Sequence, residues 1–283
     1  MPKVQSQSSL MHIRLQRHVT NGFLVVDKAG GMTSHDVVAK ARKELSTRKI
    51  GHAGTLDPMA TGVLVLGVGD GTRLLQYITA GIKAYDATVK LGELTATDDK
   101  EGEVIEKTAI PSDIPAAFAK LVGKIMQRPS SVSAIRIDGK RAYDLVREGV
   151  DVDIPARPVE VYEIKINEIR GDEVDISVKC SAGTYIRAIA RDCGGHLTSL
   201  RRTQVGIFDL SMAGKLMSVA EVASKIFTPR QLDLHEAAEM KFGRNIAASG
   251  VSGIVAALTP QGELAALLED KEGSAKPFAV FVK

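Results

Sequence analysis

One acidic residue stands where the chain can hold a carboxylate rigidly. Asp57 lies in a glycine-containing loop, residues 51–62, and Pro58 follows it directly. The proline keeps Asp57 out of the α region, and the glycines let the backbone turn sharply and approach a ligand. The apolar run 63–69 then predicts a buried strand that anchors the loop. Asp57 is therefore a candidate catalytic carboxylate, although on the loop alone an Asx turn, in which the side chain only accepts backbone N–H bonds, is the commoner meaning.

A second candidate is an arginine at the start of a predicted helix. Apolar residues recur there at helical spacing: Ile186, Ile189, Ala190 and Cys193. Arg187 is displaced from this apolar face. An arginine in such a place is usually a surface residue or half of a structural ion pair. In an ion pair it can orient a carboxylate through two parallel hydrogen bonds.

Aromatic residues supply the third kind of candidate. Tyr85 lies in an alternating pattern, residues 83–92, that predicts a strand. An isolated strand tyrosine most often packs in a core.

Strands and helices alternate along the part of the chain that carries these residues. Strands are expected at 22–28, 63–69, 83–92, 159–169 and 174–180, and helices from Thr33 or Ser34, at 73–80, at 111–126 and from 186. After residue 231 the pattern changes to apolar alternation, which predicts a small β module.

Composition and charge restrict the function classes. Formal net charge is +3, and in residues 1–50 nine lysines and arginines face three acidic residues. Such a cluster is either a solvated helix face or an approach surface for phosphates.

Cys180 and Cys193 form no CxxC motif, so we expect buried free thiols rather than a disulfide framework or a zinc site. Residues 67–71 lack the third glycine of a dinucleotide loop. No signal peptide or membrane span is predicted, so a cytoplasmic protein is expected.

Several segments, in order, resemble the tRNA pseudouridine synthases of the TruB family. The longest runs from Gly51 through the Asp57 loop, and the others are residues 27–34, 83–99, 129–143, 180–187 and 200–203. Two departures stand out: Arg136 occupies the position where the family has a lysine, and the C-terminal segment is shorter than a full PUA domain.

The resemblance implies an α+β pseudouridine synthase fold. This fold has a mixed, largely antiparallel sheet with flanking helices, a central cleft and a small C-terminal β module. The implied organisation is an N-terminal extension at 1–19, a catalytic domain at 20–230 and a short PUA-like module at 231–283. An RNA-gripping insertion is expected at about 127–157.

The resemblance also assigns roles to individual residues. Asp57 would be the catalytic carboxylate, Arg187 its ionic partner, and Tyr85 the ring that stacks on the extruded base and takes part in proton removal. The substrate-binding residues would be His52, Tyr185, Leu200, Arg136, Lys140 and Arg141. His52 would help to replace the flipped nucleotide, and the last three would grip RNA phosphates.

The implied reaction converts uridine to pseudouridine at position 55, in the T loop of tRNA. It needs no cofactor and no metal. The expected partner is the T stem-loop of tRNA, without a membrane or an obligate protein partner, and we expect a monomer. Alternatives are a non-catalytic RNA-binding or tRNA-folding protein on the same scaffold and a synthase that acts on another RNA. A glycosidase is disfavoured, because no second acidic residue has motif-level support.

Overall fold

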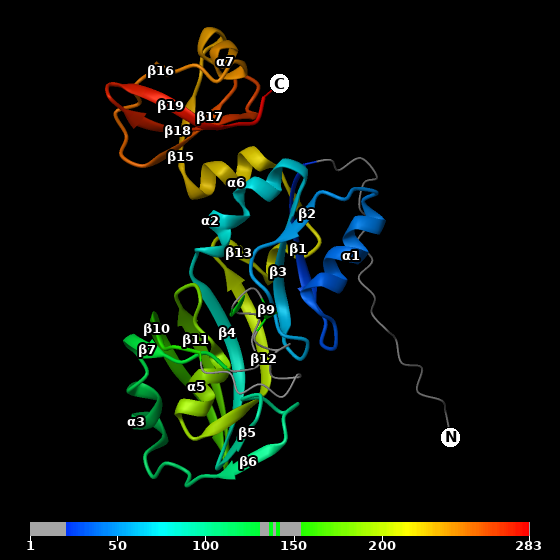
Figure 1. Cartoon of the computed structure of the whole chain (residues 1–283), viewed down its shortest axis with the longest axis vertical. Coiled ribbons are helices and arrows are strands. Elements are labelled where there is room, and N and C mark those ends of the chain that lie inside the picture. The colour runs from blue at the N-terminus through cyan, green and yellow to red at the C-terminus, as the bar shows by residue number, and fades with distance from the viewer. Residues whose placement is uncertain (1–20, 131–135, 138–139, 142–153, 283) are drawn as a thin grey trace.

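The computed structural model describes residues 21–130, 136–137, 140–141 and 154–282 (Figure 1). The predicted extension at 1–19 lies outside this range, as does most of the insertion at 127–157. Side chains of residues 136, 137, 140 and 141 are likewise outside the description.

A ten-stranded sheet forms the larger part of the molecule. Its main path runs through β14 (Leu216–Met217), β1 (Gly22–Lys28), β3 (Thr61–Val68), β12 (Gly195–Val205), β4 (Lys83–Leu91), β11 (Glu173–Cys180), β10 (Arg157–Arg170) and β7 (Gly123–Gln127). The short strands β2 (Ile50–His52) and β13 (Phe208–Asp209) pair with β3 and β12. Neighbours on this path are antiparallel except β3 and β12, which are parallel. The expected mixed, largely antiparallel α+β fold is confirmed.

The parallel pair β3–β12 joins the two halves of the sheet, and it is short. Its register matches Arg201 with Thr61 and Arg202 with Gly62. Gly62 has φ +100°, and a Cβ there would lie 2.1 Å from the carbonyl oxygen of Arg202. Only glycine allows this close approach of the two backbones.

Helices cover the sheet where the strands carry apolar residues. The helix α1 (Ser34–Glu44) begins with a capping box between Thr33 and Asp36, and it packs Val37 and Val38 against one face of β1 and β3. The opposite face of these strands is covered by α2 (Leu75–Thr79) and α6 (Val219–Ile226), which contribute to a second apolar cluster. The α1 position and its cap agree with the sequence prediction.

A third apolar cluster lies under β4, β11 and β10. It is formed with α5 (Ile186–Asp192) and α3 (Ile114–Ala119), whose Ile186, Ile189 and Phe118 are buried. The prediction of one helix over 111–126 was wrong in its second half. Gly123, at φ +102°, starts the edge strand β7 instead, because pairing with β10 satisfies its backbone.

The remaining elements of this part are short. They are the 3-10 helices η1 (Gly69–Leu74) and η2 (Leu210–Met212), the pair β5 (Glu93–Thr95) and β6 (Val104–Lys107), and the pair β8 (Arg136–Ile137) and β9 (Lys140–Arg141). In the described part of the chain, no helix is long and apolar enough to cross a membrane.

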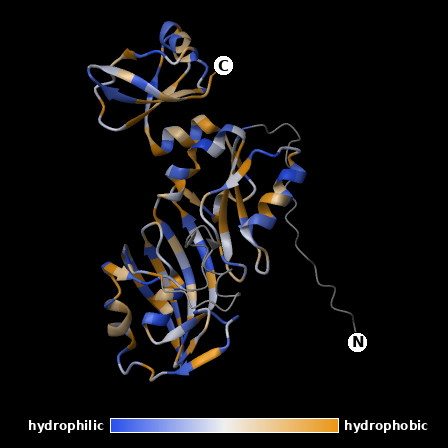
Figure 2. Cartoon of the chain, viewed as in Figure 1, coloured by the Kyte–Doolittle hydropathy of each residue, from blue (hydrophilic) through white to orange (hydrophobic). Residues whose placement is uncertain are grey.

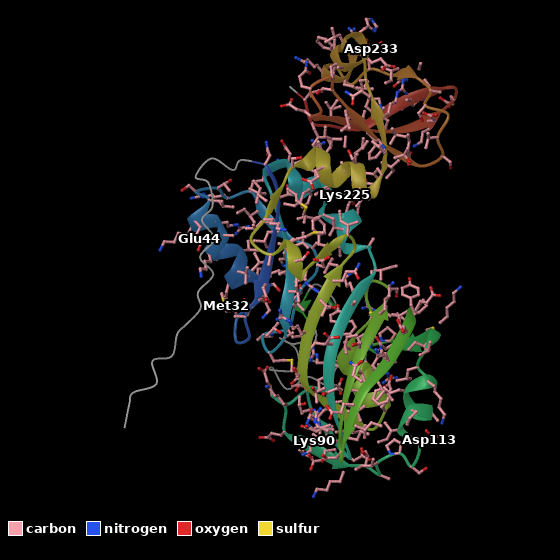
Figure 3. The ribbon with its side chains drawn as sticks, turned by 180° about the vertical axis from the view of Figure 1, so that it is seen from behind. Met32, Glu44, Lys90, Asp113, Lys225 and Asp233 are labelled. Carbon is pink, nitrogen blue, oxygen red and sulfur yellow. The ribbon has the colours of Figure 1, made fainter. Side chains whose placement is uncertain are left out.

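A separate five-stranded sheet closes the chain. Its order is β15 (Thr228–Gln231), β17 (Ile254–Leu258), β18 (Leu264–Lys271), β19 (Ser274–Val280) and β16 (Ile246–Ala247), with α7 (Leu234–Lys241) beside it. Seen from behind, Lys225 on α6 lies between this sheet and the large one (Figure 3). Figure 2 shows apolar and polar segments distributed over both parts. The domain boundary at 231 stays a prediction; the C-terminal sheet itself begins at Thr228.

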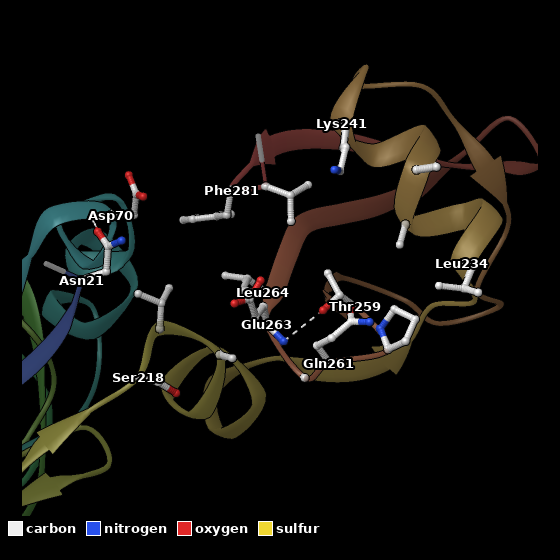
Figure 4. Close-up of a pocket in the computed structure, with 17 residues that line it drawn as sticks. Asn21, Asp70, Ser218, Leu234, Lys241, Thr259, Gln261, Glu263, Leu264 and Phe281 are labelled. Carbon is white, nitrogen blue, oxygen red and sulfur yellow. Dashed lines mark hydrogen bonds between the residues drawn. The ribbon is translucent and has the colours of Figure 1, made fainter. Parts of the chain in front are cut away.

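The C-terminal sheet packs on α6 through the second apolar cluster, which contains Leu264 and Leu267, and polar contacts add to this packing. Arg73 donates to the carbonyl of Val280 at 2.6 Å, and its guanidinium lies 4.1 Å from the centre of the Phe281 ring. Beside these contacts a cleft of about 660 Å³ opens, lined by residues of both parts that include Asp70, Ser218 and Glu263 (Figure 4).

The seam between β3 and β12 gives a stability prediction. Gly62→Ala should lower the free energy of unfolding by about 3 kcal/mol, since the new Cβ meets the Arg202 backbone at a positive φ. Thermal unfolding followed by circular dichroism measures the loss. The control is Gly171→Ala, which also has a positive φ, +64°, but has nothing within 4 Å of its Cβ. Equal losses in both variants would show that the close approach at the seam is unimportant.

Candidate active site

The site is centred on an ion pair between residues 130 positions apart in the chain. Arg187 Nε lies 3.0 Å from Asp57 Oδ2, and Arg187 Nη2 donates to Asp57 Oδ1 at 3.3 Å. The guanidinium therefore contacts both carboxylate oxygens, a geometry that fixes the plane of the acid. The arginine side chain is 5% exposed and that of Asp57 is 34% exposed. One side of the carboxylate is thus held by protein while the other reaches solvent.

A second carboxylate shares the same arginine. Arg187 Nη1 donates to the carbonyl oxygen of Thr97 at 2.8 Å and lies 3.4 Å from Asp99 Oδ2. Asp99 is buried, so two acids and a carbonyl surround the buried cation. A buried arginine needs such partners, because an uncompensated charge inside a protein is costly. Sequence reasoning missed Asp99, which lies in the acidic turn of the segment 83–99.

The start of α5 is fixed by a side-chain amide. Gln127 accepts from the Tyr185 N–H at 2.8 Å and donates to the Tyr185 carbonyl at 3.1 Å. Gln127 is 1% exposed and belongs to the edge strand β7. It therefore sets the direction in which Arg187 leaves the helix.

The Asp57 loop is anchored to α1. Ser34 Oγ accepts from the Leu56 N–H at 2.9 Å and donates to the Leu56 carbonyl at 3.2 Å. Among the described residues, the hydrogen bonds of the Asp57 carboxylate run to Arg187, not to backbone N–H groups as in an Asx turn. The ion-pair interpretation of both residues is the one the geometry supports.

A buried lysine holds the other side of the loop. Lys28, at the end of β1, donates to the carbonyl oxygens of Ala29, Met32 and Pro58 at 3.0, 2.7 and 3.2 Å. It is 1% exposed, and burial lowers its pKa to about 8. These bonds connect the end of the first strand to the residue after Asp57.

A buried arginine connects the loop to the sheet. Arg202, 1% exposed, donates to the carbonyl oxygens of Val63, Thr55 and Gly54 at 2.8, 3.3 and 3.0 Å. Its positive charge also acts on the Tyr85 hydroxyl and partly opposes the rise that burial gives to the pKa of that group. No sequence signal separates Lys28 and Arg202 from surface cations, although both lie in segments that resemble the TruB family.

Tyr85 lies on the floor of a cavity of about 310 Å³ beside the ion pair. The ring is 7% exposed, and burial raises the pKa of its hydroxyl to about 12. The phenol is therefore neutral near pH 7. The residues that line this cavity include four of the predicted site residues besides Tyr85: Asp57, Tyr185, Arg187 and Leu200.

His52 does not line this cavity. It lies at the end of β2, with its ring 5.7 Å from that of His35 on α1 at an interplanar angle of 79°. Burial lowers its pKa. Arg136 and Arg141 face each other in the pair β8–β9, next to Lys140, and their side chains lie outside the description. The predicted roles of these four residues stay predictions.

The described residues contain no group of three or more His, Cys, Asp or Glu that could hold a metal ion. Cys180 and Cys193 are buried free thiols, as expected. Burial raises the pKa of the Cys193 thiol to about 12, so it has little nucleophilic character.

Comparison with known proteins gives matches over most of the chain. Residues 42–186 match the model of the TruB family pseudouridylate synthase N-terminal domain, and residues 227–282 match that of the tRNA pseudouridine synthase II C-terminal domain. Proteins named tRNA pseudouridine synthase B are similar over most of their length. That of Arthrobacter sp. strain FB24 is 48% identical over 92% of this chain and 96% of its own, and that of Nocardia farcinica is 49% identical over 92% of each.

Solved structures share the fold. An H/ACA RNP bound to a substrate RNA containing 2′-deoxyuridine includes a chain with TM-score 0.70 and 23% identity, covering 94% of this chain and 86% of that one. A Cbf5–Nop10–Gar1 complex gives TM-score 0.68 and 25% identity, covering 94% and 85%. With both family models matched and relatives near half identity over nearly the whole chain, this protein belongs to the TruB family of pseudouridylate synthases.

Proposed function

We propose that this enzyme isomerises uridine to pseudouridine at position 55, in the T loop of tRNA, with Asp57 as the catalytic carboxylate. The observation that carries the proposal is the partly exposed carboxylate of Asp57, held by the buried guanidinium of Arg187 at the edge of a cavity lined by Tyr85. The relatives named tRNA pseudouridine synthase B support tRNA as the substrate. We further expect a cytoplasmic monomer without an obligate protein partner.

The chemistry requires a positioned anion and little else. The N1–C1′ bond breaks, a C5–C1′ bond forms, C5 loses a proton and N1 gains one, so the product is an isomer. Asp57 could add covalently to the nucleoside, or it could promote departure of uracilate before the bond to C5 forms. Both routes need the carboxylate beside an extruded nucleotide, because the reacting atoms are inaccessible inside a stack.

Tyr85 suits the role of a stacking partner with a directed hydroxyl. Its ring is buried against the core of β4 and β11, so only one surface faces the cavity. The positive charge of Arg202, which lines the same cavity, acts on the phenol oxygen. We propose that the ring supports the base and that the hydroxyl takes part in proton removal from C5.

Asp57→Asn tests the central assignment. The amide keeps the size of the side chain but cannot act as the anion, so pseudouridine formation should fall below about one per cent of wild type. Affinity for tRNA should remain within about threefold, because the carboxylate contributes little to binding a polyanion. A tritium-release or carbodiimide assay on tRNA with uridine or cytidine at position 55 measures product and position.

Glu163→Gln, an exposed acid on β10, is the matched control and should leave the rate unchanged. Product formation by Asp57→Asn at the wild-type rate would refute the catalytic role. Product at another tRNA position, or only in another RNA, would refute the proposed target. Binding of tRNA by the wild-type protein without product would favour a tRNA-folding protein.

Tyr85→Phe separates the ring from the hydroxyl. We expect the turnover rate to fall by roughly a hundredfold, as when a proton-transfer group is lost. The dissociation constant for tRNA should change little, since the ring remains in place. Single-turnover kinetics and filter binding give the two numbers. An unchanged turnover rate would mean that stacking alone is the function of Tyr85.

A further inference from the structure

We infer that Arg157 binds a phosphate that flanks the extruded uridine, with the Tyr185 ring as its support. Arg157 is the first residue of β10 and lines the same cavity as Asp57. The inference rests on the proposed function, because it names the part of the substrate that enters with the base.

Two contacts fix the Arg157 guanidinium. Its Nη2 donates to the carbonyl oxygen of Gly183 at 2.7 Å, and its Cζ lies 5.1 Å from the centre of the Tyr185 ring. A cation over an aromatic face is stabilised by the ring quadrupole. The side chain is therefore held in one orientation before any ligand arrives, which lowers the entropy that binding must overcome.

The other cations that line the cavity already donate hydrogen bonds to protein acceptors. Lys83 donates to the carbonyl oxygens of Thr79 and Gly81 at 2.6 and 3.0 Å and is buried. Arg202 donates to backbone carbonyl oxygens of Gly54 and Val63, and Arg187 contacts two carboxylates. A phosphate could reach these groups only by breaking the bonds that hold the site together.

Arg157 differs in exposure and in partners. It is partly exposed, and among the described residues it pairs with no carboxylate. The bond to Gly183 uses one of the five N–H donors of a guanidinium. The remaining donors form a fork that matches two oxygens of a phosphate.

The substrate brings the complementary charge. A uridine within RNA carries a phosphodiester on each side of its ribose, and extrusion of the base draws both toward the cavity. Asp57 is the only carboxylate among the described residues that line it, so each phosphate would be repelled by that acid. A cation on the exposed side of the cavity offsets this repulsion and fixes the register of the backbone.

A purely structural role is the alternative. Arg157 could serve only to hold the turn before α5 through the Gly183 carbonyl. The two roles differ in one measurable respect, because only a phosphate contact depends on the charge of the RNA backbone at the target.

The test is a double-mutant cycle between protein and RNA. Two full-length proteins are compared: Asp57→Asn, and Asp57→Asn combined with Arg157→Gln. The dissociation constant of each is measured for an unmodified T stem-loop RNA and for two RNAs in which the phosphate 5′ or 3′ of the target uridine is an uncharged methylphosphonate. We expect one methylphosphonate to weaken binding about tenfold when Arg157 is present and to have little effect with Arg157→Gln. Lys165→Gln, which removes an exposed cation from the same strand, should keep the full sensitivity.

Additive losses would overturn the inference, because they would show that Arg157 and both phosphates act independently. Arg157→Lys covers the case in which the glutamine variant folds poorly: it keeps the charge but not the fork, and part of the sensitivity should remain. The wild-type protein is assayed for pseudouridine in the unmodified stem-loop in parallel. Absence of product contradicts the proposed function, whereas product with additive affinities contradicts only the role of Arg157.

Discussion

The structure depends on one ion pair across the centre of the molecule. Arg187 is buried, and its two ends contact Asp57 and Asp99, which come from different loops. α5, the Asp57 loop and the turn at 97–99 each supply one member of this cluster, so the buried guanidinium has all of its partners only when the three segments are in place. The same contacts that stabilise the fold thus aim the carboxylate at the cavity.

Buried cations also donate hydrogen bonds to backbone carbonyl groups near the pairing of β3 with β12. The parallel pairing of β3 and β12 is short, and the loop before β3 is irregular, so several carbonyl oxygens lack strand partners. Arg202 donates to the oxygens of Gly54, Thr55 and Val63, and Lys28 donates to that of Pro58 and to two after β1. Lys83 donates to two more at the end of α2. Buried backbone acceptors need such donors, and a rigid loop is the result.

The charged groups of the cavity therefore fall into two sets, which differ in exposure and in hydrogen-bond partners. Its inner wall is built from cations bonded to protein, and its open side carries the partly exposed Asp57 and Arg157. This distribution suits a polyanionic substrate that presents one nucleoside. In the proposed complex the reacting base would lie against the buried side chains, and the RNA backbone would remain on the solvent side.

The sequence alone determined the fold class, the capped helix α1, the strands β1, β3, β4, β10 and β11, and the candidates Asp57, Tyr85 and Arg187. The helix and the strands follow from periodicity and capping, whereas the fold class and the roles of Asp57, Tyr85 and Arg187 are inferred from the resemblance of their segments to the TruB family. Only the tertiary structure decided that Arg187 contacts Asp57 and Asp99, that Lys28 and Arg202 are buried, and that residues 123–127 form an edge strand. A charged side chain is buried only when distant segments supply its partners, and no local pattern of residues contains those distances.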